Sequence, residues 1–420
     1  MTLQNDSSEH LHRHAHLMER VDLPTWQCHL WHKLLSPFFS GLEVGCIEVT
    51  VPSGGHLVYG RDDESGPKAR MTVYRHRTLW RILSRGTLGV AESYMDGDWS
   101  CDDLTALFDL CLQNPAIFDA VRAKGGLAHW FARLKHLRRS NSLRGSRRNI
   151  AYHYDLGNDF YSRWLDPTMT YSSAYHYGHR DSLEDAQVRK LDRALELSGL
   201  KAGDHLLEIG CGWGAFAERA ALHGVQLDGL TLSKEQLDYA RERAEAKDFA
   251  DKARFHLRDY RHEKGTYDAI VSIEMIEAVG EEHWPTYFRS LYENLRPGGR
   301  AVLQAITIHD DHYEQYRRSA DFIQTFIFPG GMLPTEDLMK RQAEAAGLIP
   351  VHVETFALDY ARTLATWREQ FLAQWSKISK LGYDERFRRM WEYYLSYCES
   401  GFANGTISVG HYAYERPTTP

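Results

Sequence analysis

A turn with three alternate glycines constrains the fold of this chain more than any other feature. An apolar run at 206–209 ends in Gly210, Gly212 and Gly214, and a helical pattern follows at once. Glycine suits such a turn because it tolerates positive φ and lets a ligand approach the backbone. Strand, turn and helix in this order point a helix N-terminus at the crevice where nucleotide-like ligands bind in α/β sheets. Alone, the pattern also fits a turn that binds nothing.

The next strand distinguishes between two kinds of ligand. A dinucleotide-binding unit places an acid about twenty residues after the glycines, on the ribose hydroxyls. Here Thr231 stands at that place, Gln236 follows one helical turn on, and Asp228 precedes the strand tip. The third glycine also comes one residue earlier than in the G-x-G-x-x-G pattern that binds a pyrophosphate. These features favour S-adenosylmethionine (SAM), which carries no phosphate, and place Glu208 near its ammonium group. An NAD-type oxidoreductase is the alternative.

Strand and helix patterns alternate through the second half of the chain. Strands are expected at 205–209, 225–230, 254–257, 267–273 and 300–307, and helices at 214–223, 233–247 and 282–295. This alternation predicts an α/β fold with a mostly parallel, doubly wound sheet. Aromatic-rich helices at 309–328 and 362–401 predict either a packed cover or a pocket for an acyl chain.

Composition excludes several classes of protein. A net charge of −7 does not suit a nucleic-acid binder, and the six cysteines show no metal-ligand spacing, so no metal is expected. The cysteines indicate reduced thiols in a cytoplasmic protein. No apolar run is long enough to span a bilayer, and no signal peptide is recognisable.

Four segments are expected along the chain: a flexible N-terminus (1–20), a small α+β domain (21–130) that binds lipid in one interpretation, a basic linker (131–150) and a catalytic domain (151–420). The stretch 133–148 holds seven basic residues and no acid. It is either a solvated linker or a patch for anionic head groups. RNA binding is a third interpretation, which the negative net charge of the chain argues against. The mixed aromatic and polar segment 151–175 predicts a lid over the site or a plain loop.

Eight motifs carry a family resemblance. They are GVAESYMDG (89–97), HYDLGND (153–159), YSSAY (171–175), EIGCGWG (208–214), TLSKEQ (231–236), EMIEAVG (274–280), FPGGMLP (328–334) and YYLSYC (393–398). In this order they resemble the cyclopropane-fatty-acyl-phospholipid synthase family, which includes the mycolic acid cyclopropane synthases. The resemblance runs from Gly86 to the C-terminus. It implies a class I SAM-methyltransferase fold, SAM as cofactor, and acyl chains with a cis double bond as substrates.

The resemblance and the glycine turn predict one cofactor site. Its residues are Tyr171, Ser172, Glu208, Gly210, Gly212, Gly214, Thr231, Leu232, Gln236, Asp259 and Tyr260.

The resemblance also implies how the reaction ends. Methyl transfer to an alkene leaves a carbocation, and a base must remove a proton from the new methyl group to close a ring. In family members that contain bicarbonate, that ion is the base, held by Cys, Glu, His and Tyr side chains and one amide. The corresponding positions are Ser173, Glu277, Gln304, Tyr360 and the amide of Ile306. Gln304 can donate a hydrogen bond to the anion but adds no charge, so bicarbonate use stays open.

Cys398 matches a cysteine that is often regarded as active in this family, although a buried structural thiol is the other interpretation.

The sequence therefore predicts an enzyme that forms a cyclopropane ring on an unsaturated phospholipid of the bilayer, at the inner membrane face. Loss of the base would instead give a methyl-branched or methylated unsaturated chain. A non-catalytic lipid-binding protein is a third hypothesis. Double-bond position, head group and oligomeric state, a homodimer included, are left open by the sequence.

Overall fold

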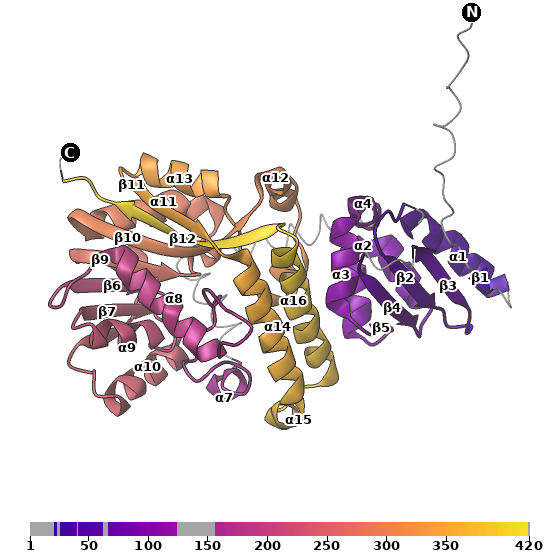
Figure 1. Cartoon of the computed structure of the whole chain (residues 1–420), viewed down its shortest axis with the longest axis horizontal. Helices are drawn as coiled ribbons and strands as arrows, with labels where there is room; N and C mark the ends of the chain where they lie inside the picture. The colour runs from indigo at the N-terminus through magenta and orange to yellow at the C-terminus, as the bar shows by residue number, and fades with distance from the viewer. Residues whose placement is uncertain (1–20, 23–25, 40, 62–65, 124–155, 419–420) are drawn as a thin grey trace, which may run out of the picture. The chain divides into compact units, whose positions relative to one another are not determined.

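The computed structural model describes residues 21–22, 26–39, 41–61, 66–123 and 156–418 (Figure 1). The chain divides into two compact units, Met1–Gly126 and Leu127–Pro420. The predicted N-terminal segment 1–20, the basic linker and the first part of the 153–159 motif lie outside the described residues.

The N-terminal unit is a five-stranded sheet with helices. Its strand order is β1-β3-β2-β4-β5, with β2 and β4 parallel and the other neighbours antiparallel. The strands are β1 (Val21–Asp22), β2 (Cys46–Thr50), β3 (His56–Gly60), β4 (Lys68–Val73) and β5 (Trp99–Cys101). The helices are α1 (Trp26–Phe39), α2 (Arg77–Met95), α3 (Leu104–Gln113) and α4 (Pro115–Ala123). The predicted α+β character of this region is confirmed.

The segment 86–95, which holds most of the GVAESYMDG motif, is helical. It forms the second half of α2, which bends at Gly86, where φ is 55° and ψ is −133°. After the bend the two halves pack closely, since a Cβ at Gly89 would lie 2.1 Å from the carbonyl oxygen of Arg81. The glycines therefore mark a helical corner, which requires a positive φ at one position and no side chain at the other.

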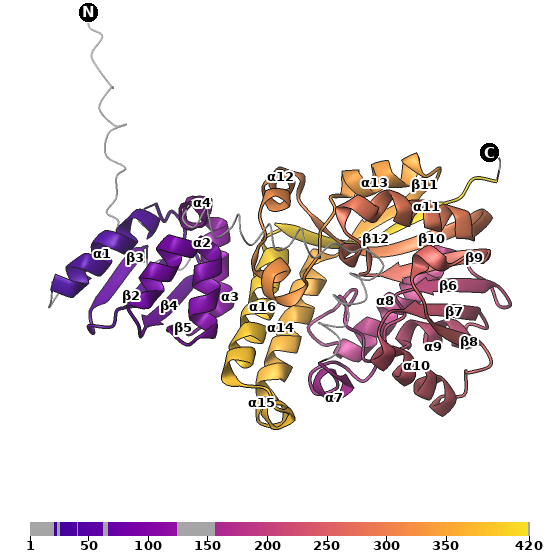
Figure 2. The same ribbon diagram turned by 180° about the vertical axis from the view of Figure 1, so that it is seen from behind.

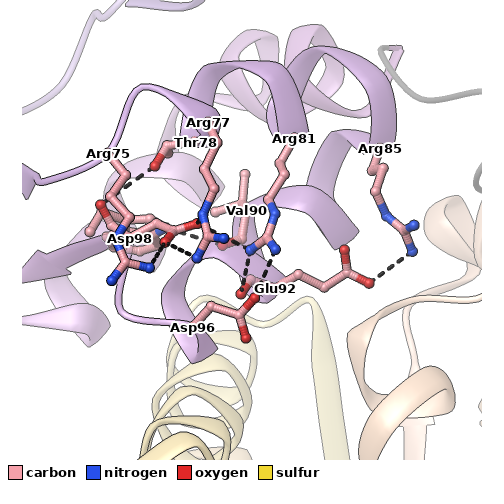
Figure 3. A network of polar contacts seen from close by, with 10 residues as sticks. Arg75, Arg77, Thr78, Arg81, Arg85, Val90, Glu92, Asp96 and Asp98 are labelled. Carbon is pink, nitrogen blue, oxygen red and sulfur yellow. Dashed lines mark hydrogen bonds and ion pairs between the residues drawn. The ribbon is translucent and has the colours of Figure 1, made fainter.

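Asp98 ties this corner to β5 (Figure 3). Its fully buried carboxylate accepts hydrogen bonds from Arg75 (3.1 Å), Arg77 (2.6 and 2.7 Å) and Arg81 (3.1 Å). Its backbone N–H donates to Ser93 at the end of α2. Charge-assisted bonds of this kind satisfy a buried carboxylate and hold the corner in one geometry.

The C-terminal unit contains a seven-stranded sheet of order β11-β12-β10-β9-β6-β7-β8. The strands are β6 (His205–Ile209), β7 (Gln226–Thr231), β8 (Ala253–Leu257), β9 (Tyr267–Ile273), β10 (Leu295–Ile308), β11 (Ile349–Thr355) and β12 (Ile407–Glu415). The five predicted strands are present and parallel, which confirms the doubly wound α/β prediction. Two antiparallel strands were not predicted: β12 lies beside β10, and β11 forms the edge.

Helices cover both faces of this sheet (Figure 1 and Figure 2). Alternate residues of β6 and β9 belong to two separate cores, as expected for a sheet buried on both sides. One core includes α8 (Leu183–Ser198), α9 (Ala215–Leu222) and α10 (Lys234–Ala246). The other includes α11 (Trp284–Asn294) and α13 (Glu336–Ala345).

The added helices differ in part from the expectation. The predicted helix at 309–328 is broken: α12 (Asp310–Arg318) ends early, and a π-helical turn follows at Ile323–Ile327. The predicted pair at 362–401 appears as α14 (Ala357–Ala373) and α16 (Glu385–Ala403), which lie side by side in both views (Figure 1 and Figure 2). None of the helices in the described segments has the length and apolar character needed to cross a membrane.

Candidate active site

A cavity of about 160 Å³ opens at the carboxyl ends of β6, β7 and β9. Ten of the eleven residues predicted for the cofactor line it: Tyr171, Ser172, Glu208, Gly210, Gly212, Thr231, Leu232, Gln236, Asp259 and Tyr260. The eleventh, Gly214, is the N-cap of α9 with φ 83° and is not among the lining residues. The structure thus brings together residues from four separate segments at the edge where α/β sheets bind ligands.

The glycine turn gives this cavity a backbone floor. Gly210 and Gly212 have φ of 90° and 50°, in the left-handed region. The amides of Gly210 and Cys211 both donate to the carbonyl oxygen of Leu230 at 2.9 Å, which fastens the turn to β7. A Cβ at Gly212 would have no neighbour within 4 Å, so this residue leaves room for a ligand against the main chain.

Glu208 gives the cavity the chemistry of a cation site. It lies at the end of β6, it is buried, and its Oε2 has no hydrogen-bond partner among the described residues. Burial raises the pKa of its carboxyl group to about 8. An unpartnered buried carboxyl group gains most from a positively charged ligand. The residues of the cavity therefore fit SAM, and Glu208 is the group that would bind its ammonium group.

Polar groups after β7 and β8 are already oriented. Thr231 donates to Oε1 of Gln236 at 3.0 Å and accepts from the amide of Ser233 at 3.1 Å, which fixes the Gln236 amide. Asp259 binds Arg261 through both oxygens, at 2.8 and 2.6 Å. Burial alone would raise the pKa of Asp259, but the hydrogen bonds and charge of Arg261 lower it. The part of the cavity that is predicted to hold the ribose therefore contains a fixed side-chain amide, on Gln236, and an ionised carboxylate, on Asp259.

The segment before the sheet forms the opposite wall. Tyr171 donates to or accepts from Tyr394 of α16 at 2.8 Å, and Asn158 accepts from Trp213 of the glycine turn at 2.6 Å. Residues 169–172 line the cavity. The segment 151–175 had two interpretations, a lid over the site or a plain loop. Its described part, 156–175, contributes a wall of the cavity and is therefore more than a plain loop.

A second carboxylate, that of the partly buried Glu274, faces the same cavity. Glu274 follows β9 and has φ 48°, an uncommon conformation for a residue with a side chain. Its Oε1 accepts hydrogen bonds from the amide of Ser173 (2.8 Å) and from Nε2 of Gln304 (2.7 Å), and its Oε2 accepts from the hydroxyl of Tyr360 (2.7 Å). Such an unfavourable backbone geometry persists where the surrounding structure fixes it, and it often marks a functional residue.

These contacts decide whether bicarbonate fits as predicted. Three of the five predicted ligand positions, Ser173, Gln304 and Tyr360, do converge, but on the carboxylate of Glu274. The amide of Ile306 is bound by Glu277, and the hydroxyl of Ser173 turns away to its neighbour's carbonyl oxygen. The donors that would hold the anion are therefore occupied, and a bicarbonate ion does not fit this arrangement.

Glu274 and Glu277 lie in different electrostatic environments. Burial raises the pKa of Glu277 to about 8, with the charge of Glu274 adding to the shift, so Glu277 is largely protonated at neutral pH. The pKa of Glu274 is also raised by burial, and the charge of Lys190 and the hydrogen bonds from Tyr360, Ser173 and Gln304 oppose part of this shift. Environments that separate the pKa values of two carboxyl groups give them different roles. Here Glu274 is the group suited to accept a proton.

Lys190 completes the electrostatics of this wall. It is fully buried on α8 and donates to the hydroxyl of Ser172. Burial lowers its pKa to about 7, whereas Glu274 and Asp166 act in the opposite direction. A buried ammonium beside a buried carboxylate favours the charged form of each.

Cys398 does not belong to this group of residues. It lies on α16, is not among the residues that line the cavity, and has its pKa raised by burial and by Asp321. A thiol kept protonated is a weak nucleophile and a weak base, which favours the interpretation of Cys398 as a buried structural thiol; its catalytic role stays a prediction.

The aromatic helices form a packed cluster next to Tyr171. Trp164, Trp367 and Trp391 are buried, and the ring centroids of Trp164 and Trp367 lie 5.5 and 5.2 Å from that of Tyr171. Their side chains fill the space between α14, α16 and the wall, as the packed-cover interpretation predicts.

Sequence reasoning missed two residues at the site. Glu274 was visible as an acid three positions before Glu277 in EMIEAVG, but nothing in that spacing shows which of the two faces the cavity. Lys190 stands in a helical stretch with Arg189 and Arg193, and nothing in its spacing distinguishes it from a surface charge.

Comparison with known proteins agrees with this geometry. Residues 141–412 match the family model described as mycolic acid cyclopropane synthetase. The chain is 39% identical over 381 residues to the tuberculostearic acid methyltransferase UfaA1 of Mycobacterium tuberculosis (strain ATCC 25618 / H37Rv), covering 87% of this chain and 88% of that protein. It is 38% identical over 347 residues to the cyclopropane-fatty-acyl-phospholipid synthase of Escherichia coli (strain K12), covering 80% and 85%.

A solved structure also matches the C-terminal unit. The crystal structure of mycolic acid cyclopropane synthase CmaA1, complexed with SAH and CTAB, has 32% identity and a TM-score of 0.60, and the match covers 64% of this chain and 98% of that one. The class I methyltransferase fold and the SAM-dependent activity predicted from the sequence are thereby confirmed. The chain belongs to the mycolic acid cyclopropane synthetase family of SAM-dependent methyltransferases.

Proposed function

We propose that this enzyme methylates the cis double bond of an unsaturated phospholipid acyl chain and closes a cyclopropane ring. The observation that carries the proposal is the position of Glu274, a partly buried carboxylate on the wall of the cofactor cavity. No group in the wall needs to activate the acceptor, because an alkene is itself the nucleophile. What the chemistry requires is a base for the step that follows.

The residues act on the acyl chain in a defined order. SAM, when bound, supplies a methyl group to one alkene carbon, and the neighbouring carbon of the chain becomes positively charged. Glu274 then takes a proton from the new methyl group. The electrons of that C–H bond form the third side of the ring, and Glu274 is left as a carboxylic acid. Tyr360 and Gln304 hold the carboxylate in place throughout.

The aromatic wall protects the cation. Tyr171 lines the cavity, and the rings of Trp164 and Trp367 pack against it and against each other. Aromatic faces stabilise a nearby positive charge, and a buried aromatic cluster keeps out water that would capture it.

A second product is supported by one comparison. The relative that shares 39% identity over 87% of this chain is named as a tuberculostearic acid methyltransferase. A hydride shift on the acyl chain before proton loss would give a methylated unsaturated chain, from which a methyl branch follows only after reduction. Glu274 would accept the proton in this case also.

Product analysis tests the proposal and distinguishes the two candidates. The purified full chain would be incubated with SAM and a monounsaturated phospholipid, and the fatty acids would be analysed by mass spectrometry before and after catalytic hydrogenation. A gain of one CH2 that takes up no hydrogen under mild conditions identifies the ring. A gain of one CH2 with uptake of hydrogen identifies the methylated alkene. The proposal is wrong if no mass gain occurs on any unsaturated phospholipid.

We also propose that the N-terminal unit binds the membrane surface through the first half of α2. Trp80 is 73% exposed and Tyr74 is 54% exposed, an unusual degree for large aromatic side chains, and Arg75 and Arg77 are exposed beside them in the sequence. Aromatic rings and arginines side by side suit the interface between head groups and acyl chains.

Vesicle binding provides the test. Trp80→Ala should weaken co-sedimentation with vesicles that contain anionic phospholipid by about tenfold, because burial of a Trp side chain contributes roughly 1.5–3 kcal/mol. Leu222→Ala is the matched control, since Leu222 is 69% exposed on α9 of the other unit and should not change binding. Equal binding by both variants would exclude this face as the membrane contact.

A further inference from the structure

Three polar side chains form a row behind Glu274, one on each of three neighbouring strands. Gln304 of β10 lies opposite His411 of β12, and His411 lies opposite Glu354 of β11. Nε2 of His411 is 3.2 Å from Oε1 of Gln304, and Nδ1 of His411 is 2.9 Å from Oε1 of Glu354. With the 2.7 Å bond from Gln304 to Glu274, a continuous hydrogen-bonded chain connects the cavity with the sheet edge.

The donors and acceptors in this row determine the state of His411. Gln304 uses its NH2 group on Glu274 and therefore presents its oxygen, an acceptor, to His411. Glu354 also presents an acceptor. Burial alone would raise the pKa of Glu354, but the hydrogen bonds and charges of His411 and Arg193 hold it well below its usual range. An imidazole that faces two acceptors satisfies both only when both of its nitrogens carry hydrogen.

Charges from every neighbouring element act on this imidazole. Burial lowers the pKa of His411 below its usual value; the hydrogen bond and charge of Glu354 oppose this shift, and the charges of Lys190 and Arg193 on α8 add to it. The rings of Tyr175 and Phe356 close the remaining sides, with centroids 5.5 and 4.8 Å away. The hydrogen-bond geometry decides the balance, because a neutral imidazole would set a bare nitrogen against an acceptor in a dry site.

We propose that His411 is a positioning residue for proton removal: as an imidazolium it fixes the Gln304 amide with its NH2 group toward Glu274 and so keeps Glu274 ionised. The resemblance places a histidine at position 304, where this chain has glutamine. The structure supplies an imidazole one side chain further away, on the adjacent strand. This inference rests on the proposed function, because it assigns His411 a part in the step that Glu274 performs.

Removal of the imidazole has a specific kinetic consequence. In His411→Phe, the Gln304 amide loses its orientation and Glu274 loses a nearby positive charge, so the pKa of Glu274 rises. The acidic limb of the kcat profile should move up by about one pH unit, so that kcat at pH values on that limb should fall by about tenfold, with KM for SAM and lipid unchanged. In a Glu274→Gln background the same substitution should cause no further shift.

His352→Gln is the matched control. His352 also lies near Glu354, at 3.4 Å, but does not contact Gln304, and its side chain is partly exposed. The His352→Gln substitution should leave the pH profile of kcat unchanged. A His411→Phe profile that coincides with that of the wild type would overturn the proposal.

Nitrogen-15 NMR of the full chain with labelled histidine tests the charge state without turnover. The His411 signals, recognised by their absence in His411→Phe, should show both nitrogens protonated at pH 7 in the wild type. They should show a lower imidazolium pKa in Glu274→Gln. A neutral His411 in the wild type at pH 7 would refute the inference, even if the expected lipid product forms. A charged His411 in a protein that forms no methylated lipid would leave the inference standing and the proposed function refuted.

Discussion

Replacing Glu274 with glutamine should lower the rate of lipid product formation by about 10²–10⁴-fold, the usual contribution of a positioned general base. Glutamine keeps the shape and can still accept a hydrogen bond from Tyr360, but it cannot take up a proton. SAM affinity should change by less than about tenfold, since the proposed cation partner is Glu208 and not Glu274. Product would be quantified by mass spectrometry and SAM binding by calorimetry.

Glu277→Gln is the comparison that isolates the role of charge. Glu277 lies three residues away, its pKa is raised to about 8, and one oxygen accepts from the amide of Ile306. Because Glu277 is largely protonated at neutral pH, a glutamine reproduces its hydrogen bonding. Its effect on the rate at pH 7 should be at least about tenfold smaller than that of Glu274→Gln. Equal losses in the two variants would mean that the base has been assigned to the wrong carboxylate.

The affinity for SAM should rise steeply with pH until about pH 8 and then level off. In the free protein, burial raises the pKa of Glu208 to about 8, so the group is protonated at pH 7. A cation at this site favours the ionised form, so binding releases a proton. Below the pKa, each pH unit should therefore change the affinity by up to about tenfold, with tighter binding at higher pH.

Calorimetry in two buffers of different ionisation enthalpy would count the released proton. Glu208→Gln should weaken binding by about tenfold or more above pH 8 and remove this pH dependence. A wild-type affinity that is flat between about pH 6 and 8, or one that falls as pH rises, would show that Glu208 does not face the cation.

The fold was predictable wherever its determinants are local. The strand, glycine turn and helix at 205–222 are fixed by apolar periodicity and by glycines that need positive φ, and both can be read from a few residues. Strand β12 could not be predicted in this way, because its pairing with β10 joins residues about a hundred positions apart. The corner of α2 could not be predicted either, because two glycines in a short stretch more often indicate a turn than a tight helix–helix contact.

The same distinction applies to the site. Ten predicted cofactor residues line one cavity because they follow the ends of parallel strands, and strand ends meet at one edge of a sheet. The proton acceptor was not predictable, since the choice between Glu274 and Glu277 depends on one backbone angle, φ 48° at Glu274. The contribution of His411 depends on the register of β12, which the sequence does not reveal.

The assignment of Glu274 as the base is tested most directly by the dependence of activity on bicarbonate. Activity would be measured in carbonate-depleted buffer for the wild type and for Glu274→Gly. Glycine tolerates the positive φ at this position, and its lack of a side chain leaves the donors of Ser173, Gln304 and Tyr360 open to a small anion. We predict that the rate of the wild-type enzyme does not depend on bicarbonate. The Glu274→Gly variant should be inactive until bicarbonate is added. A wild-type enzyme that loses activity on depletion and regains it with bicarbonate would contradict the assignment of Glu274 as the base.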